Sequence, residues 1–144
     1  MKPAEIAELN EKLTLARAAA ARALPYFGAA LFRVPLICEP SIPTMAIDKH
    51  WRVYYSPVFV RAQNVHTLAF VLLHEISHTL REHHERYDKL GDKEQFTWNL
   101  ATDCEINDGL LEACKASLNR AETANFVFPK ACGFSNDLTA EQYY

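Results

Sequence analysis

Apolar residues recur along much of this chain at spacings of three and four residues, and this periodicity predicts the main helices. From Pro3 to about Leu24 they fall three and four residues apart, which gathers them on one face of a helix. A second helical run follows Asn64, which is a favourable N-cap residue, and continues to Leu80 before the sequence turns polar. Both runs predict helices that pack against a core.

Further helices are predicted in the second half of the chain. Asp92–Gln95 has the pattern of a capping box and opens a helix that we expect to continue through Asn107 and to pause at Gly109. A separate helix is predicted over Leu110–Ala121. A second capping-box pattern at Thr139–Gln142 predicts a helix start close to Tyr144, so we expect the chain to be the front piece of a longer protein.

Strand patterns lie between the first two helices. Ala29–Ile37 is apolar but is interrupted by Pro35, which favours a short strand or loop at a sheet edge. Thr44–Ile47 and Trp51–Tyr55 flank a short polar turn and predict a hairpin, followed by a helical turn after Ser56. The predicted class is α+β, with helices packed on a small, mostly antiparallel sheet.

Composition and charge narrow the possible partners and location. The 144 residues suit one domain, and a net charge of -3 makes a nucleic-acid partner a poor hypothesis. We expect no membrane span, because no apolar run reaches roughly 18 residues, and no signal peptide, because the N-terminal stretch is charged. A reducing cytoplasm is the predicted location, since the four cysteines are widely spaced: Cys38, Cys104, Cys114 and Cys132.

One stretch of the second helical run carries candidate chemistry. His74-Glu75-Ile76-Ser77-His78 places two histidines four residues apart, so their imidazoles lie side by side on a helix and suit one Zn²⁺ ion. Glu75 lies about 100° around the helix from His74, beside the metal, where it suits a general base better than a ligand. The alternative is a core helix with chance histidines, but three buried ionisable groups without a partner cost free energy.

A catalytic zinc needs a third protein ligand, and the sequence offers several candidates. His84 stands where an extended H-E-x-x-H-x-x-G-x-x-H motif has its last histidine, but Arg81 replaces the glycine that would break the helix. A continuing helix would carry His84 past the metal, and the same holds for His83. We therefore predict Asp103 as the third ligand. Asn99 and Asn107 lie one turn on either side of it to orient the ligands.

Three motifs follow one another in this part of the chain: His74-Glu75-x-x-His78, His83-x-x-Arg86 and Trp98-Asn99-x-Ala101-x-Asp103-x-x-Ile106-Asn107. Together they closely resemble the zinc metallopeptidase domain found ahead of von Willebrand factor A-like domains in bacterial and phage proteins. The resemblance covers roughly Pro43 to the end. It implies a compact zincin core and, after Tyr144, a longer protein with a von Willebrand factor A-like domain. The layout is also similar to gluzincins, with Asp103 as carboxylate ligand and Asn107 supporting it.

The sequence thus predicts a single metallopeptidase-like domain over residues 1–144, with a zincin-like fold of minimal gluzincin type. Its predicted function is hydrolysis of a protein or peptide substrate, with zinc activating water and Glu75 as general base. The strand Trp51–Tyr55 is expected to lie at the cleft and pair with an extended substrate. The donor for the oxyanion stays open among five residues: Tyr54, Tyr55, His83, Arg86 and Tyr87.

Two other functions fit the same residues. One is a zinc-dependent hydrolase that cleaves small amides rather than peptides. The other is a binding module in which zinc is structural or catalysis is lost. The intact Glu75 argues against the binding module, because a structural site needs no general base and is usually closed by four protein ligands.

Overall fold

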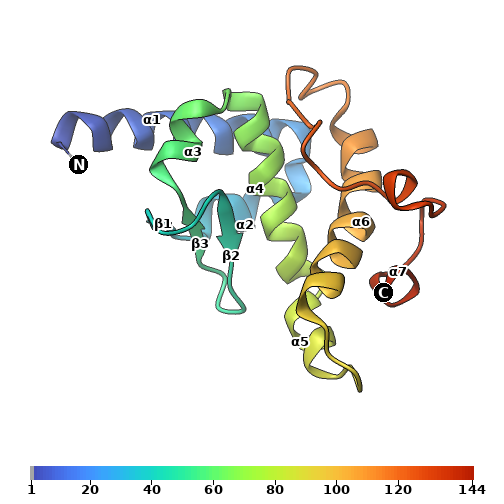
Figure 1. The fold of residues 1–144 in the computed structure, drawn as a ribbon. Helices are drawn as coiled ribbons and strands as arrows, with labels where there is room; N and C mark the ends of the chain where they lie inside the picture. The colour runs from blue at the N-terminus through green and yellow to red at the C-terminus, as the bar shows by residue number, and fades with distance from the viewer. Residues whose placement is uncertain (1) are drawn as a thin grey trace.

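Helices dominate the molecule and are arranged around α4 (Val65–Leu80), as the computed structural model of residues 2–144 shows (Figure 1). The long helix α1 (Pro3–Ala23) packs against α4. A small sheet covers another side of α4, and α6 (Gln95–Cys114) runs alongside it on the side away from the sheet. Because neighbours cover α4 from several directions, nearly all of its middle is buried. The helical spacing of α1 and α4 predicted from the sequence is confirmed.

The sheet contains, within the described residues, three short strands in the order β1-β3-β2. β2 (Met45–Ile47) and β3 (Val53–Tyr55) form the predicted antiparallel hairpin. β1 (Leu36–Cys38) pairs with the other edge of β3 in parallel. The sheet is therefore mixed, and the prediction of a mostly antiparallel sheet is wrong in this respect. The α+β class is confirmed.

The segment before β1 differs from the prediction. A 3-10 turn, η1 (Pro25–Phe27), leads into α2 (Gly28–Arg33), where the sequence predicted a strand or loop over residues 29–37. Strand structure is confined to the end of that stretch. After the hairpin, α3 (Pro57–Ala62) starts as predicted, with the Ser56 side chain accepting a hydrogen bond from the Phe59 backbone at 3.5 Å.

The helix α4 ends at Leu80, and the predicted continuation through Arg81 is wrong. Glu82 adopts a left-handed conformation with φ of 55°, and α5 (His83–Asp88) starts immediately afterwards. A residue with a side chain is strained there by roughly 1–2 kcal/mol, so the surrounding contacts must hold the turn in place. This turn places His83, the first residue of α5, against His78 near the end of α4.

The helix α6 is longer than predicted and starts two residues later than the capping-box pattern implied. Its N-cap is Glu94, and it passes through Gly109 without interruption to Cys114. The separate helix predicted over Leu110–Ala121 is therefore wrong. Farther on lie η2 (Pro129–Cys132) and α7 (Ala140–Tyr143), and the predicted capping box at Thr139 is present at the start of α7.

Two groups of buried side chains hold these elements together. The large core joins α1, α2, the sheet, α3 and α4 to the C-terminal half of α6. The small core joins the N-terminal half of α6 to α7 and consists of a few residues: Trp98, Ala101, Cys104, Ala140 and Tyr143. The two ends of α6 thus belong to different cores.

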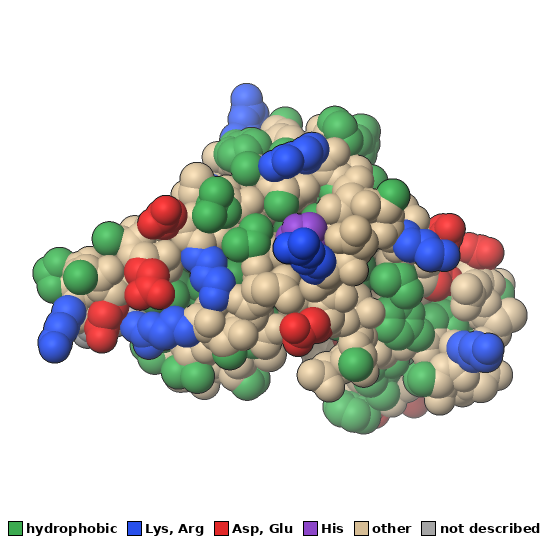
Figure 2. All heavy atoms as spheres, turned by 90° about the horizontal axis from the view of Figure 1, so that it is seen from above, with side chains coloured by type: hydrophobic (Ala, Val, Ile, Leu, Met, Phe, Trp, Pro, Cys, Tyr) green, Lys and Arg blue, Asp and Glu red, His purple; other side chains and the backbone are tan. Residues whose placement is uncertain are grey.

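The surface in Figure 2 carries charged side chains of both signs, interspersed over the face seen there. This mixture accords with the small net charge of -3. In residues 2–144, no helix combines the length and the apolar character needed to cross a membrane.

Candidate metal centre

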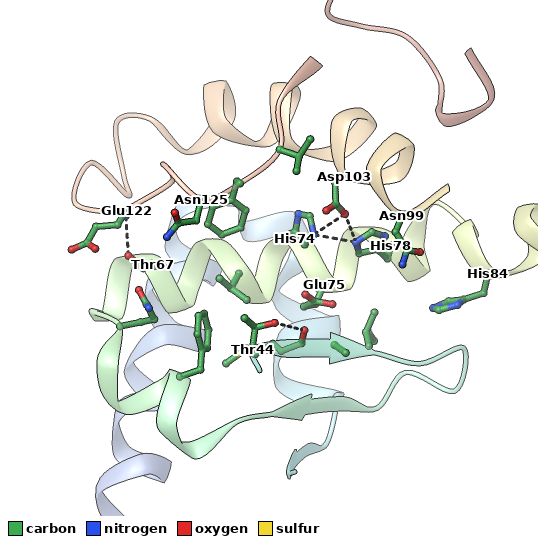
Figure 3. Close-up of a pocket in the computed structure, with 18 of the residues that line it drawn as sticks. Thr44, Thr67, His74, Glu75, His78, His84, Asn99, Asp103, Glu122 and Asn125 are labelled. Atoms are coloured by element: carbon green, nitrogen blue, oxygen red, sulfur yellow. Dashed lines mark hydrogen bonds and ion pairs between the residues drawn. The ribbon is translucent and has the colours of Figure 1, made fainter. Parts of the chain in front are cut away.

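Three side chains predicted to bind a metal are brought together by α4 and α6. His74 and His78 lie one turn apart on α4, whose start is fixed by Asn64 accepting a hydrogen bond from the Thr67 backbone at 2.9 Å. Asp103 faces them from α6, and Figure 3 shows all three side chains pointing towards one another. One ligand atom from each residue lies within 4.8 Å of the other two.

The distances between these atoms fit a bound metal ion. His74 Nε2 and His78 Nε2 are 3.0 Å apart, and each lies 3.4 Å from Asp103 Oδ1. Ligands at about 2.0–2.2 Å from a tetrahedral Zn²⁺ ion are separated from one another by about 3.3–3.6 Å. Two imidazole nitrogens and one carboxylate oxygen are also a donor set that zinc accepts. The residues therefore fit a metal, with at least one position open to water or substrate.

The orientation of His74 is fixed by Asn107 on α6. The Asn107 Nδ2 group donates to the Val127 carbonyl at 2.8 Å, so its Oδ1 atom faces His74 Nδ1 at 2.7 Å as an acceptor. The hydrogen of a neutral His74 ring therefore belongs on Nδ1, which leaves an electron pair on Nε2 for the metal. Asn107 is fully buried, and the sequence predicted this supporting role.

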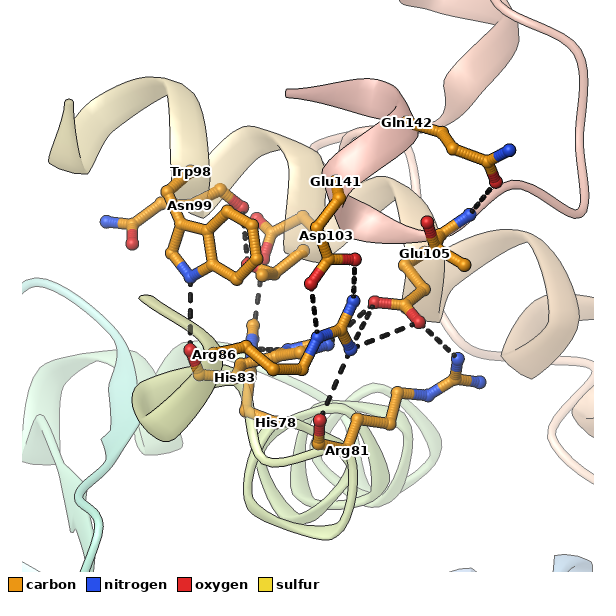
Figure 4. A network of polar contacts seen from close by, with 12 residues as sticks. His78, Arg81, His83, Arg86, Trp98, Asn99, Asp103, Glu105, Glu141 and Gln142 are labelled. Carbon is orange, nitrogen blue, oxygen red and sulfur yellow. Dashed lines mark hydrogen bonds and ion pairs between the residues drawn. The ribbon is translucent and has the colours of Figure 1, made fainter. Parts of the chain in front are cut away.

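The orientation of His78 is fixed by a different chain of contacts. Its Nδ1 atom lies 2.9 Å from His83 Nδ1, and His83 Nε2 lies 2.8 Å from a carboxylate oxygen of Glu105 (Figure 4). From the sequence, His83 was a candidate ligand and a candidate oxyanion donor, and Glu105 was not predicted to contribute. The sequence pattern His83-x-x-Arg86 reflects this arrangement, because both residues contact Glu105, Arg86 at 3.1 Å.

The charges around the three atoms call for a cation between them. Burial alone would raise the pKa of Asp103, but hydrogen bonds from the two imidazoles hold it far below its usual range. Burial lowers the pKa of His78 to about 4, while for His74 the contacts with Asp103 and Glu75 outweigh burial and raise the pKa. A proton on His74 can therefore balance Asp103 in the metal-free protein, and a metal ion would displace that proton.

Glu75 lies beside these atoms at the wall of a cleft of about 550 Å³. Figure 3 shows its carboxylate on the side of α4 that faces β2. Burial raises the pKa of Glu75 to about 7, although the neighbouring His74 opposes this shift. The cleft also holds apolar side chains from α3, α4 and the C-terminal segment, namely Phe59, Val71 and Phe126.

The strand along this cleft is β2 rather than the predicted Trp51–Tyr55 segment. β3 lies in the middle of the sheet and is paired on both edges, so its backbone is not available to an extended substrate. β2 is at the sheet edge in the described part of the chain, and the whole of it lines the cleft. The prediction that Trp51–Tyr55 pairs with substrate is therefore wrong.

His84 lies in the cleft, although the structure does not bring it into the group formed by His74, His78 and Asp103. The reason given for excluding it, a continuing helix, does not hold, because the chain turns at Glu82. Asn99 also lines the cleft. The five candidate oxyanion donors are absent from its lining within residues 2–144: Tyr54, Tyr55, His83, Arg86 and Tyr87. His84, which does line the cleft, was not among the predicted donors.

Comparison with known families places this arrangement in context. The model of the family described as "Putative metallopeptidase domain" matches residues 8–144. The chain belongs to this metallopeptidase family. The match includes both α4 and α6, and so all three candidate ligands and Glu75. Neither a curated protein nor a solved structure matches the chain.

Proposed function

We propose that this member of the metallopeptidase family is a zinc-dependent peptidase in which His74, His78 and Asp103 hold the ion. The observation that carries the proposal is the convergence of three ligand atoms within 4.8 Å, next to a buried glutamate in an open cleft. A structural zinc site is usually closed by a fourth protein ligand and has no use for such a glutamate.

A bound zinc ion would supply Lewis acidity, polarising the scissile carbonyl and lowering the pKa of water at the site. Glu75 accepts the proton of that water and later delivers it to the leaving amine. Its position one residue after His74 keeps it beside the ligands without making it one of them. Each imidazole has its hydrogen on Nδ1, facing Asn107 or His83, and would use Nε2 for the metal, so neither ring competes with Glu75 for this proton.

The cleft suits an extended peptide chain. The free edge of β2 runs along it, and an extended segment placed there would gain backbone hydrogen bonds as an added strand. This edge strand, the helix with both histidines and the aspartate on a later helix support a zincin-like fold of minimal gluzincin type. The four cysteines, all free in the described residues, are compatible with work in a reducing cytoplasm.

The test compares wild type with Glu75→Gln, using metal content and cleavage of a proteome-derived peptide library as separate measurements. We expect about one zinc ion per chain in both proteins. Peptide cleavage should fall by roughly 10²–10⁴-fold in the variant, because a general base contributes about that much. Both proteins should unfold at similar temperatures, since the substitution keeps the size of the side chain.

The alternatives give different results when the same two proteins are also tested on small amides. Cleavage of small amides with peptides left intact would indicate an amidase, and zinc binding without any hydrolysis would indicate a binding module. Zinc loss in Glu75→Gln would mean that Glu75 is a ligand, which contradicts the mechanism. A wild-type protein that takes up no zinc would end the proposal.

A further inference from the structure

His83 lies against His78 on the side away from Asp103, and a strained turn brings it there. The left-handed residue Glu82 bends the chain after α4, so that the first residue of α5 packs its ring 5.1 Å, centre to centre, from that of His78. His83 is 3% exposed, and its backbone carbonyl accepts a hydrogen bond from Trp98 Nε1 at 3.2 Å. A buried histidine held on both its ring and its backbone has one well-defined orientation.

The two rings can share one hydrogen in a single useful way. Their Nδ1 atoms are 2.9 Å apart, so one must donate and the other must accept. If His78 binds metal through Nε2, its hydrogen is on Nδ1, and His83 must accept with Nδ1. The hydrogen of His83 then belongs on Nε2, which needs an acceptor of its own.

Glu105 is that acceptor, and its charge is secured by arginines. Its carboxylate lies 2.8 Å from His83 Nε2. Arg86 reaches the same carboxylate at 3.1 Å and Arg81 reaches it at 3.4 Å, so it stays ionised and can accept but not donate (Figure 4). Arg86 is itself held by Glu141 of α7 at 2.8 Å. Every nitrogen of the path from Glu105 to His78 thus has one consistent role.

We propose that His83, fixed by Glu105, is a positioning residue that keeps the Nε2 electron pair of His78 directed at the metal. The inference rests on the proposed metal centre and extends it to residues that touch neither metal nor substrate. The other histidine ligand is supported by a neutral amide, Asn107, at 2.7 Å. His78 is supported instead by a path that ends in the carboxylate of Glu105, whose side chain is 10% exposed. A carboxylate at the end of this path also makes His78 a more basic ligand.

The experiment uses two substitutions of His83 that differ in one property. His83→Leu removes the acceptor, whereas His83→Asn keeps one, because its Oδ1 atom takes the place of Nδ1. We expect His83→Leu to lower zinc affinity by about 10–100-fold and His83→Asn to restore most of that loss. Affinity is measured by chelator competition on the full chain. His50→Leu, the same change at an exposed histidine, is the control and should bind zinc as wild type does.

A second measurement reports on the ring itself rather than on affinity. The ¹⁵N shifts of the histidine rings in metal-free protein should show hydrogen on Nδ1 of His78 in wild type and in His83→Asn. In His83→Leu we expect a mixture of the two neutral forms. Glu105→Gln keeps the length of the side chain, and its zinc affinity should lie between those of wild type and His83→Leu. This variant tests the inference if His83→Leu does not fold.

The outcomes separate this inference from the proposed function. If wild type and His50→Leu bind zinc but His83→Leu binds it equally well, the inference fails while the metal centre stands. An affinity loss in His83→Leu that His83→Asn does not restore would mean that His83 acts through packing, which also overturns it. Absence of zinc binding in wild type would overturn the proposed function instead.

Discussion

The two helices that carry the candidate ligands are anchored in very different surroundings. α4, with His74 and His78, runs through the large core, where its apolar side chains pack against α1 and the sheet. Asp103 stands on α6 near the point where that helix leaves the large core. Ile106 and Leu110 belong to the large core, whereas Trp98 belongs to the small core with α7.

This difference shows where a metal ion would contribute most to the fold. The large core can hold α4 without help, because it buries many large apolar side chains. The small core buries far less, so the N-terminal half of α6 depends more on its polar contacts with α4 and α5. An ion that joins His74, His78 and Asp103 would connect the well-anchored side to the weakly anchored one.

The largest effect on zinc binding should come from removing Asp103, the ligand that α6 contributes. Asp103→Ala leaves two imidazoles on one helix and no carboxylate from the other, so we expect it to abolish stoichiometric zinc binding. His84→Ala should leave zinc binding nearly intact, since His84 is outside the group of converging ligand atoms. Elemental analysis and zinc titration of both variants check this. Metal loss in His84→Ala with retention in Asp103→Ala would reverse the assignment.

A smaller effect is expected from metal removal, which should destabilise the small core more than the large core. Zinc at a thousand times its dissociation constant would stabilise the fold by about 4 kcal/mol, or roughly 10–20 °C in melting temperature for a chain of this size. After chelation, hydrogen exchange should speed up most in α5, α7 and the first half of α6. Exchange in α1 and β3 should change little. A uniform increase over both cores would contradict the comparison.

The smallest effect concerns the hairpin on the large-core side. Although burial opposes it, hydrogen bonds from Arg52 and from the backbone lower the pKa of Asp48 to about 2. A lowered carboxyl pKa adds stability above about pH 4, and this is lost as the pH falls from 4 towards 2. Solvent screening limits the amount, so Asp48→Asn should cost under about 1 kcal/mol at pH 7.

Denaturation of wild type and Asp48→Asn, with and without zinc, measures this cost and tests whether the hairpin depends on the metal centre. The cost of Asp48→Asn should be equal in both cases, because the hairpin turn is held by its own charges and by the large core. Below pH 4 the difference between variant and wild type should shrink. A cost that depended on zinc would show that the hairpin and the metal centre are coupled.

The parts of the fold predicted correctly from the sequence are those set by local pattern. The apolar spacing of α1 and α4, the cap at Asn64 and the hairpin around Asp48 depend on residues close together in the chain, and the structure contains all of them. The convergence of His74, His78 and Asp103 was also expected, since two helices that each present polar residues on an otherwise apolar face tend to bring them together.

The errors arose where distant contacts override local preference. The apolar stretch of residues 29–37 has no clear period, and its helical start is decided by packing on α1 and α4. Arg81 and Glu82 favour a helix, yet the chain turns there, because Glu105 and Trp98 of α6 hold Arg86 and His83 of α5. A longer protein with a von Willebrand factor A-like domain stays a prediction.

The turn at Glu82 has a consequence for how such a centre can be recognised in other sequences. A search for H-E-x-x-H alone would accept a chain with one residue inserted after Leu80, although that insertion would lengthen the turn that places the start of α5. His83 would then lose the position in which its ring lies against that of His78, while the H-E-x-x-H motif stayed unchanged. A search pattern for such a centre should therefore include the spacing of five residues from His78 to His83 as well as H-E-x-x-H.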